Sequence, residues 1–441
     1  MTTTYPLHGA FSRPDDTFPE QADVVIVGAG IMGCAAAYYL SRRGLKAVVF
    51  DKSRVAGQQS TRAWGFVRQQ GREAAEVPLM MAGMRIWEGL ERELGTISNG
   101  ARAAASTWPT RRRLGRLPGL ARGGAPARAR HAHAVERRGR PAREGAGRAG
   151  AGGLYTASDG QAEPRRVAPA FAARAIEGGA RFFDGCGVTA IETANGAVTG
   201  VLTERGRVRS ARVICAAGAT SFRLLDGIGI RLPQQTVRGT CIRTNALPAV
   251  SAATIWGHGL GIRQRADGAI NLADDMTVDL DFSFGHLRGL SLYLPEFWKH
   301  REKFRVRVNG ALLADLKRRL AGGHDAIEPR EPLPRPNPAQ GPRALARLKR
   351  IFPALAAAQA VESWAGVIDV LPDGIPVIDA PEDVRGLAIA TGFCGHGFAM
   401  GPIVGRLLAE LVDSGQPSLA LGEFRARRFV DGTMKRPRSM L

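Results

Sequence analysis

The sequence predicts an α/β dinucleotide-binding domain of the Rossmann type, joined to a second, α+β domain that contains antiparallel strands. Three observations support this fold class: a glycine-rich turn between two apolar strands at 22–52, a β-meander at 187–221, and alternating polar and apolar residues at 259–275. A chain of 441 residues is long enough for two domains, each with its own core.

The stretch "ADVVIVGAGIMGCAAAYYLSRRGLKAVVFDK" (22–52) is the most informative part of the chain. It predicts a buried strand, a G-x-G-x-x-G turn at Gly28, Gly30 and Gly33, a helix of small residues, and a second strand that ends at Asp51. We expect Gly28 to permit the tight turn, Gly30 to let a pyrophosphate approach the backbone, and Gly33 to let the helix pack against the strand. The start of the helix offers free N–H groups to phosphate, and Asp51 can accept hydrogen bonds from ribose hydroxyls.

The later elements follow in order along the chain. A loop rich in Gly, Ser and Arg occupies 57–72, a helical pattern covers 76–94, and a helix that begins at a proline leads to a short strand within 159–183. Turns at Asn195-Gly196 and Arg205-Gly206 divide 187–221 into three strands, the last of which is buried and ends in "AAG". The two C-terminal blocks, 363–381 and 386–415, contain an apolar strand and a final helix that we place at 400–413.

The charge of the chain is concentrated in one segment. The formal net charge is +21, but residues 101–150 hold 13 arginines against two acids. In that segment 38 of the 50 residues are Ala, Arg, Gly or Pro, which is typical of GC-rich DNA translated out of frame. We therefore favour a pair of compensating frameshifts over about 97–151, and expect this segment to be poorly packed. A disordered insertion and a genuine nucleic-acid-binding arm are the alternatives; sequencing the coding DNA tests the frameshift.

Other features of the composition exclude several classes of protein. The five cysteines have no metal-ligand spacing, so we expect reduced, buried thiols and no metal site. The N-terminal residues do not form a secretion signal, and no apolar run is long enough to span a bilayer. These observations predict a cytoplasmic protein.

The ordered set of blocks resembles the D-amino-acid oxidase/glycine oxidase/sarcosine oxidase family of FAD enzymes. The motifs that carry the resemblance are G-x-G-x-x-G (28–33), A-A-G (216–218), W-A-G with P-D-G-x-P-x-I (364–378), and T-G-F-x-G-H-G-F (391–398). The resemblance implies a FAD-binding domain of the glutathione-reductase type formed by 20–75, 154–225 and 356–430. It also implies a substrate domain with a large antiparallel sheet, formed by 76–153 and 226–355.

By this resemblance, the FAD site combines distant parts of the chain. The implied residues are Gly28, Ala29, Gly30, Ile31, Met32, Gly33, Asp51, Lys52, Ser60, Thr61, Arg62, Val188, Ala217, Gly218, Gly366, Asp373, Gly395, His396, Gly397 and Phe398. Asp51 stands where the family usually has Glu. No His lies in the 57–72 loop and no Cys lies between 300 and 370, the two usual anchors of covalent flavin, so we expect non-covalent FAD.

The substrate side of the site is less well defined by sequence. An amino-acid substrate needs a cation for its carboxylate, and Arg263 and Arg68 fall where relatives place pocket residues. His396 is the third candidate catalytic residue, although we favour a role in orienting its loop through hydrogen bonds. Trp256, His258 and Met276 are further candidates for the pocket wall.

Taken together, these features predict a FAD-dependent oxidoreductase that oxidises the C–N bond of an amino acid or secondary amine. Hydride transfer to flavin N5 would give an imine that hydrolyses in water. The expected partners are the small substrate and an electron acceptor, either oxygen or a respiratory quinone, with no nucleic acid. Two other functions remain open at this point: an NAD-linked dehydrogenase that uses only the first motif, and a nucleic-acid-binding protein that uses 101–150. The substrate, the choice between oxidase and dehydrogenase, and the oligomeric state do not follow from sequence.

Overall fold

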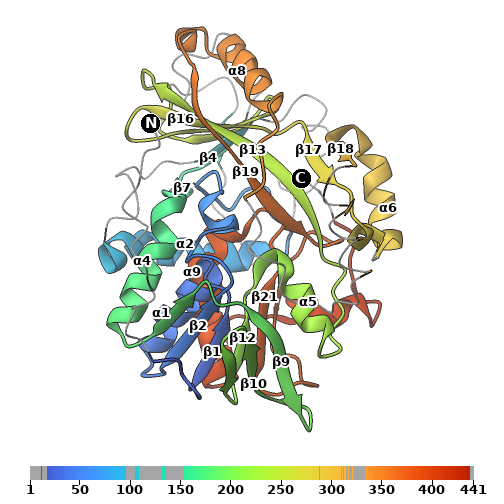
Figure 1. Ribbon diagram of the computed structural model, residues 1–441. Coiled ribbons are helices and arrows are strands. Elements are labelled where there is room, and N and C mark those ends of the chain that lie inside the picture. The colour runs from blue at the N-terminus through green and yellow to red at the C-terminus, as the bar shows by residue number, and fades with distance from the viewer. Residues whose placement is uncertain are drawn as a thin grey trace.

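A computed structural model gives the fold of the chain (Figure 1). It describes residues 17–95, 105–108, 132–134, 153–287, 289–308 and 333–437, together with position 11 and single positions between 310 and 320. The segment 97–151, which we expect to be poorly packed, lies outside the described residues, except for two short strands at 105–108 and 132–134.

A six-stranded sheet forms the lower half of the molecule (Figure 1). Its order is β20-β21-β12-β1-β2-β8, with all neighbours parallel except β20 and β21. The strands are β1 (Val24–Val27), β2 (Ala47–Asp51), β8 (Arg181–Asp184), β12 (Val213–Cys215), β20 (Val377–Asp379) and β21 (Leu387–Thr391). The predicted first strand and second strand are therefore confirmed, and they are neighbours at the centre of the sheet.

The two faces of this sheet are covered by different layers. Val24 and Ile26 of β1 pack with helices, whereas Val25 and Val27 pack with the β-meander, because successive side chains of a strand point to opposite faces. The helices are α1 (Ile31–Ser41), α2 (Glu76–Leu94), α4 (Pro164–Glu177) and α9 (Gly397–Asp413). The meander consists of β9 (Val188–Ala194), β10 (Ala197–Thr203) and β11 (Gly206–Arg209). The α/β part of the predicted fold class is thus confirmed.

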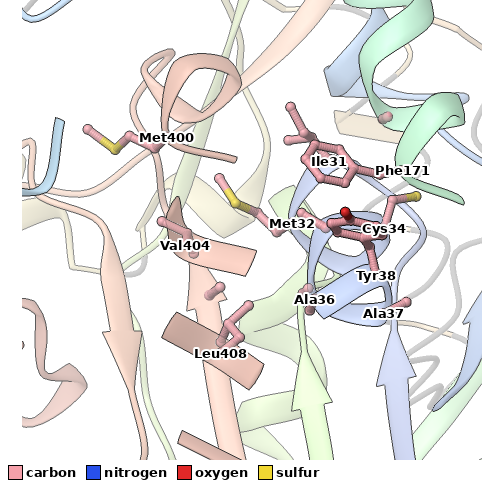
Figure 2. Packing of buried hydrophobic residues seen from close by; sticks show 14 of the residues in the cluster. Ile31, Met32, Cys34, Ala36, Ala37, Tyr38, Phe171, Met400, Val404 and Leu408 are labelled. Carbon is pink, nitrogen blue, oxygen red and sulfur yellow. The ribbon is translucent and has the colours of Figure 1, made fainter. Parts of the chain in front are cut away.

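Small residues let α1 and α9 pack in close contact. A Cβ atom on Gly405 would lie 2.3 Å from the Cβ of Ala35, and one on Gly401 would lie 2.5 Å from Ile31. Figure 2 shows the two helices side by side, with Met32 of α1 pointing toward α9 near Val404. The close packing fixes the start of α9 near the start of α1. Helix α9 begins at residue 397, three residues before the predicted start.

A ten-stranded sheet forms the upper half. Its order is β18-β17-β13-β16-β15-β14-β4-β6-β5, and β19 also pairs with β13. The strands are β4 (Ala105–Trp108), β5 (Ala132–Ala134), β6 (Gly153–Thr156), β13 (Gln235–Ala246), β14 (Thr254–Gly257), β15 (Leu260–Gln264), β16 (Ala269–Asp274), β17 (Val278–Asp281), β18 (Phe304–Arg307) and β19 (Ala360–Val370). The sheet is mixed rather than purely antiparallel, because β14–β4 and β17–β18 are parallel pairs.

The remaining elements are short or peripheral. Helix α8 (Gln340–Ile351) packs on this second sheet and shares a core with β15 and β16, and α6 (Leu290–Lys299) lies beside β17 and β18 (Figure 1). The others are α5 (Ser221–Asp226), β3 (Phe66–Val67), β7 (Gly160–Gln161), η1 (Gln59–Thr61), η2 (Gly218–Thr220), η3 (Phe284–Leu287), η4 (Arg301–Lys303), η5 (Pro353–Leu355), η6 (Gly422–Phe424) and η7 (Ala426–Phe429). Among the described residues, no helix has the length and apolar character needed to cross a bilayer.

Candidate active site

A cavity of about 330 Å³ lies between the two sheets. Most of the residues predicted to bind FAD line it, although they come from six separate parts of the chain. The predicted residues on its wall are Gly28, Gly30, Ile31, Met32, Asp51, Lys52, Ser60, Arg62, Val188, Ala217, Gly218, Gly366, Gly395, His396, Gly397 and Phe398, together with the substrate candidate Arg68. Ala29, Gly33, Thr61, Asp373 and Arg263 do not line it.

The glycine-rich turn has the geometry that its sequence predicts. Gly28 has a φ of +102°, which few other residues adopt, and a Cβ on it would lie 2.3 Å from the carbonyl oxygen of Ala216. A Cβ on Gly33 would lie 1.9 Å from the carbonyl oxygen of Gly28. By contrast, the nearest atom to a Cβ on Gly30 is the Ser60 hydroxyl oxygen, 3.3 Å away. Gly33 is therefore required for close packing, while Gly30 leaves backbone accessible at the cavity.

Asp51 organises this turn and also lines the cavity. Its carboxylate accepts hydrogen bonds from the backbone N–H groups of Ala29 and Ser53, both at 2.7 Å. Burial raises the pKa of Asp51, against these two hydrogen bonds and the nearby Lys52. Each carboxylate oxygen has a second lone pair, so the same side chain can also accept hydrogen bonds from a ligand's hydroxyl groups.

Two neighbouring hydroxyl residues in the 57–72 loop have different positions. The Ser60 hydroxyl accepts a hydrogen bond from the N–H of Ile31 at 2.9 Å, and so occupies one of the free donors at the start of α1. Thr61 instead donates to the carbonyl of Ala56 at 3.0 Å, and it is not on the cavity wall. Ser60 is thus positioned at the helix N-terminus, where an anionic group would bind.

The buried carboxylate of Asp369, in β19, connects three separate segments at the cavity. Asp369 accepts hydrogen bonds from the side chains of Gln59 (2.9 Å) and Gln234 (3.0 Å) and from the N–H of Gly392 (2.8 Å). These contacts join η1, β19 and the loop that follows β21. The loop leads directly into α9, so the network holds the N-terminus of α9 at the cavity wall, where its dipole favours negative charge.

His396 lies at the start of α9 and lines the cavity. Its Nδ1 is 3.1 Å from the carboxylate of Glu76, a fully buried residue at the start of α2. Burial and the nearby Arg72 guanidinium lower the pKa of His396, although Glu76 opposes the shift. The imidazole is therefore neutral near pH 7, and its contact with Glu76 fixes the loop before α9.

Arg68 lines the cavity with a guanidinium that has one buried nitrogen without a hydrogen-bond partner among the described residues. The side chain is buried, with 7 % of its surface exposed, and its guanidinium carbon lies 3.7 Å from the ring centroid of Trp256. The Phe66 ring lies on the same guanidinium, with a distance of 5.6 Å. Nη1 of Arg68 has no hydrogen-bond partner among the described residues. A buried guanidinium N–H without a partner is costly unless a ligand satisfies it.

Asp159 supplies a titratable charge behind Arg68. Burial raises the pKa of Asp159 to about 6, although hydrogen bonds from Gln69 and the charge of Arg68 oppose this shift. One carboxylate oxygen accepts from the N–H of Gln69 at 2.9 Å, and the other has no hydrogen-bond partner among the described residues. Ionisation of Asp159 is therefore unfavourable to the folded state.

Replacing Asp159 with asparagine should change the pH dependence of stability. The pKa of Asp159 is higher in the folded protein than in the unfolded chain. Its contribution to the free energy of unfolding is therefore fully present below about pH 4 and is lost as the pH rises through about 6. The free energy of unfolding of Asp159→Asn, relative to the native protein, should therefore rise by about 2 kcal/mol between pH 4.5 and pH 8. Urea unfolding at the two pH values measures this, and a difference independent of pH would contradict it.

Two predicted residues have structural contacts away from the cavity. Arg263 is 2 % exposed, and its guanidinium donates to the carboxylate of Glu163 (3.1 Å) and the carbonyl of Ala162 (2.9 Å). Asp373 accepts from Arg428 at 2.6 Å and so attaches the C-terminal segment. The carboxylate-binding position expected for Arg263 and the cofactor contact expected for Asp373 are therefore not supported, because each side chain is already paired elsewhere. Of the pocket candidates, Trp256 lines the cavity, and His258 and Met276 do not.

Several cavity residues were missed by sequence reasoning. Gln59 and Arg72 lie in the 57–72 loop, whose polar composition was the available signal. Thr240 lies in β13, Asp275 in the turn after β16, and Lys303 in η4, and no local motif marks them.

Comparison with known proteins agrees with this geometry. The family model "FAD dependent oxidoreductase" (DAO) matches residues 23–411, most of the chain. The chain belongs to this family. The resemblance noted from sequence is therefore confirmed, and FAD is the cofactor of the family.

Individual members of the DAO family are similar over almost their whole length. The chain is 27% identical to sarcosine oxidase subunit beta of Rhizobium meliloti, covering 96% of this chain and 91% of the relative. It is 24% identical to glycine oxidase of Geobacillus kaustophilus, covering 92% and 97%. The structure of L-amino acid deaminase from Proteus myxofaciens has the same fold, with a TM-score of 0.84, 23% identity, and coverage of 94% and 95%.

The residues on the cavity wall fit the family's cofactor. The turn at Gly28 has no room for a side chain, and the hydroxyl of Ser60 and carboxylate of Asp51 lie where a nucleotide needs polar groups. Arg62, whose Nε is buried without a hydrogen-bond partner among the described residues, adds a cation to the same wall. A DAO-family enzyme is thus supported by both the comparisons and the local geometry.

Proposed function

We propose that the chain oxidises the C–N bond of an amino acid or an N-substituted amino acid. The observation that carries this proposal is Arg68, a buried guanidinium with an unpartnered N–H in the cavity that also holds the glycine-rich turn. A guanidinium of this kind binds a carboxylate with geometric specificity. The names of the relatives, which include sarcosine, glycine and D-amino-acid enzymes, support an amino-acid substrate.

In the proposed reaction, the α-carbon loses a hydride and the amine nitrogen loses a proton, which gives an imine that water hydrolyses. FAD, when bound, supplies the two-electron acceptor for this step. Arg68 holds the substrate carboxylate, and the ring of Trp256 holds Arg68 in place. The N-terminus of α9 stabilises negative charge that develops at its end of the cavity.

We assign His396 a positioning role in this reaction. Its contact with Glu76 fixes the loop at the start of α9, and its lowered pKa keeps the imidazole uncharged near neutral pH. An uncharged ring does not compete with Arg68 for the substrate carboxylate. We also propose that the ten-stranded sheet is the core of the substrate domain, since Thr240 and Trp256 reach the cavity from its strands and Asp275 from the turn between β16 and β17.

The other functions considered from sequence are less well supported. The family match is to FAD enzymes, which does not favour an NAD-linked dehydrogenase. Most of the 101–150 segment lies outside the described residues, and nothing supports a nucleic-acid function for it. Cytoplasmic location and the frameshift over 97–151 remain predictions from sequence.

A panel of amines and amino acids tests the proposed function. Anaerobic addition of a true substrate should bleach the flavin absorbance of the purified protein, and readmission of air should restore it only if oxygen is an acceptor. Failure of air to restore the absorbance, with recovery on adding a soluble quinone, would indicate a dehydrogenase. A purified protein that takes up no FAD would contradict the proposal.

The mode of flavin attachment gives a separate prediction. The cysteines on the cavity wall are Cys241 and Cys394, and burial raises the pKa of both thiols, so neither is a ready nucleophile. We expect acid precipitation to release all of the flavin into the supernatant, where its absorbance is measured. Yellow colour that stays in the pellet would contradict non-covalent binding.

A further inference from the structure

Helix α6 is firmly attached to the protein through one of its faces. The hydroxyl of Tyr293 lies within hydrogen-bond distance of the carbonyls of Pro233 (2.6 Å) and Val370 (2.8 Å). The ring of Phe297 packs on that of Phe304 in β18, with centroids 5.4 Å apart. These contacts fix the orientation of the helix, so its solvent-exposed residues are held outward.

The outward side of α6 is apolar. Leu290, Leu294 and Trp298 follow one another at intervals of four residues, which places them on one side of a helix. Their exposed fractions are 45 %, 41 % and 58 %, and no residue of the helix is fully buried. Val306 in the adjacent strand β18 is also 52 % exposed. We call these four residues the apolar face; large side chains exposed together commonly mark a binding surface.

Positive charge borders the apolar face. The segment 299–308 contains five cations and one acid, Glu302. The cations, which we call the basic rim, are Lys299, Arg301, Lys303, Arg305 and Arg307. Lys299 pairs with Glu296 (3.3 Å) and Arg307 pairs with Asp279 (2.9 Å), so these two carboxylates reduce the charge of the rim without cancelling it. Cations on an edge strand such as β18 also discourage pairing with another strand, but that purpose does not account for an exposed Trp and two Leu on the neighbouring helix.

We propose that the apolar face and the basic rim dock the protein on the surface of an anionic lipid bilayer. Leu and Trp side chains on one side of a helix insert at the boundary between headgroups and acyl chains, and Trp is favoured at that depth. The surrounding cations attract anionic headgroups. A neutral or basic protein partner would not provide this charge complementarity. Lys303 belongs to both the basic rim and the cavity wall, so the docked surface is continuous with the site. This inference does not depend on the substrate.

Vesicle flotation with the FAD-loaded, full-length protein tests the inference. The protein should float with vesicles of phosphatidylglycerol and phosphatidylcholine, and about 0.5 M salt should weaken this binding. Pure phosphatidylcholine vesicles should bind much less. The double variant Leu294→Ser/Trp298→Ser should bind the anionic vesicles at least about tenfold more weakly. Arg301→Glu/Arg305→Glu should lose about tenfold or more at low salt.

Matched controls separate this surface from a general loss of folding. Leu202→Ser removes a leucine of similar exposure (39 %) from β10, and Arg92→Glu reverses an exposed cation on α2. Both controls should bind as the unaltered protein does, and all variants should keep their flavin content and unfolding temperature. The inference is overturned if the unaltered protein does not float, or if the α6 variants and controls lose binding equally. It is also overturned if light scattering shows that the α6 variants instead dissociate an oligomer.

Discussion

Replacing Arg68 with leucine should raise the KM for amino-acid substrates by about 100-fold or more, with a smaller effect on the reduction rate at saturation. A buried, charge-assisted contact between a guanidinium and a carboxylate contributes about 3 kcal/mol or more to the free energy of substrate binding. Because this contact is present in both the ground state and the transition state, its loss raises KM more than it lowers the rate at saturation. The measurement is the anaerobic rate of flavin reduction as a function of substrate concentration.

The substrate series provides the discriminating control for this prediction. An amine that lacks a carboxylate should be oxidised equally, and slowly, by native protein and Arg68→Leu, because it never contacts the guanidinium. Arg68→Lys should recover part of the binding, since lysine keeps the charge but not the planar fork. Arg92→Leu, which changes an exposed arginine of α2, should have no effect. Equal losses for substrates with and without a carboxylate would contradict the assigned role.

Replacing Gly33 with alanine should abolish FAD binding and destabilise the fold by more than about 4 kcal/mol. The added Cβ would lie 1.9 Å from the carbonyl oxygen of Gly28, a backbone atom that cannot rotate away. Separating α1 from β1 would also move the turn that faces the cavity. The flavin-to-protein ratio and the unfolding temperature measure both effects.

Gly422→Ala is the matched control for this substitution. A Cβ at Gly422 would have no neighbouring atom within 4 Å, so its stability should stay within about 0.5 kcal/mol of the native value. If Gly33→Ala bound FAD at full stoichiometry, the close contact between α1 and β1 would not be needed for the site.

Local sequence was sufficient to predict the nucleotide end of the site. The glycine spacing, the strand before it and Asp51 all lie within about 30 residues, and backbone sterics alone determine what such a segment can do. In the structure Gly28 has the positive φ and Gly33 the close contact that the motif predicts, and Asp51 lies on the cavity wall. That these residues bind FAD stays a prediction. The helix that follows the last motif was also predicted, with an error of three residues at its start.

Sequence reasoning was weaker on the substrate side because side-chain direction on a strand depends on pairing. Arg263 pairs with Asn271 across β15 and β16, and its side chain points to Glu163 rather than to the cavity. A shift of one residue would reverse that direction, and the alternating pattern alone cannot specify which face meets the cofactor. Of the two arginine candidates, Arg68, from an irregular loop, was the one that reached the cavity.

The sequence by itself determined the family, the cofactor and the nucleotide turn, because these depend on contiguous motifs and on the order of the blocks. Only the tertiary structure decided which of the two arginines lines the cavity, that Glu76 contacts His396, and that α6 holds apolar side chains exposed. Each of these depends on contacts between residues far apart in the chain, such as the 320 positions between Glu76 and His396. The contact between Glu76 and His396 arises where α2 packs against α9, and no local pattern encodes it.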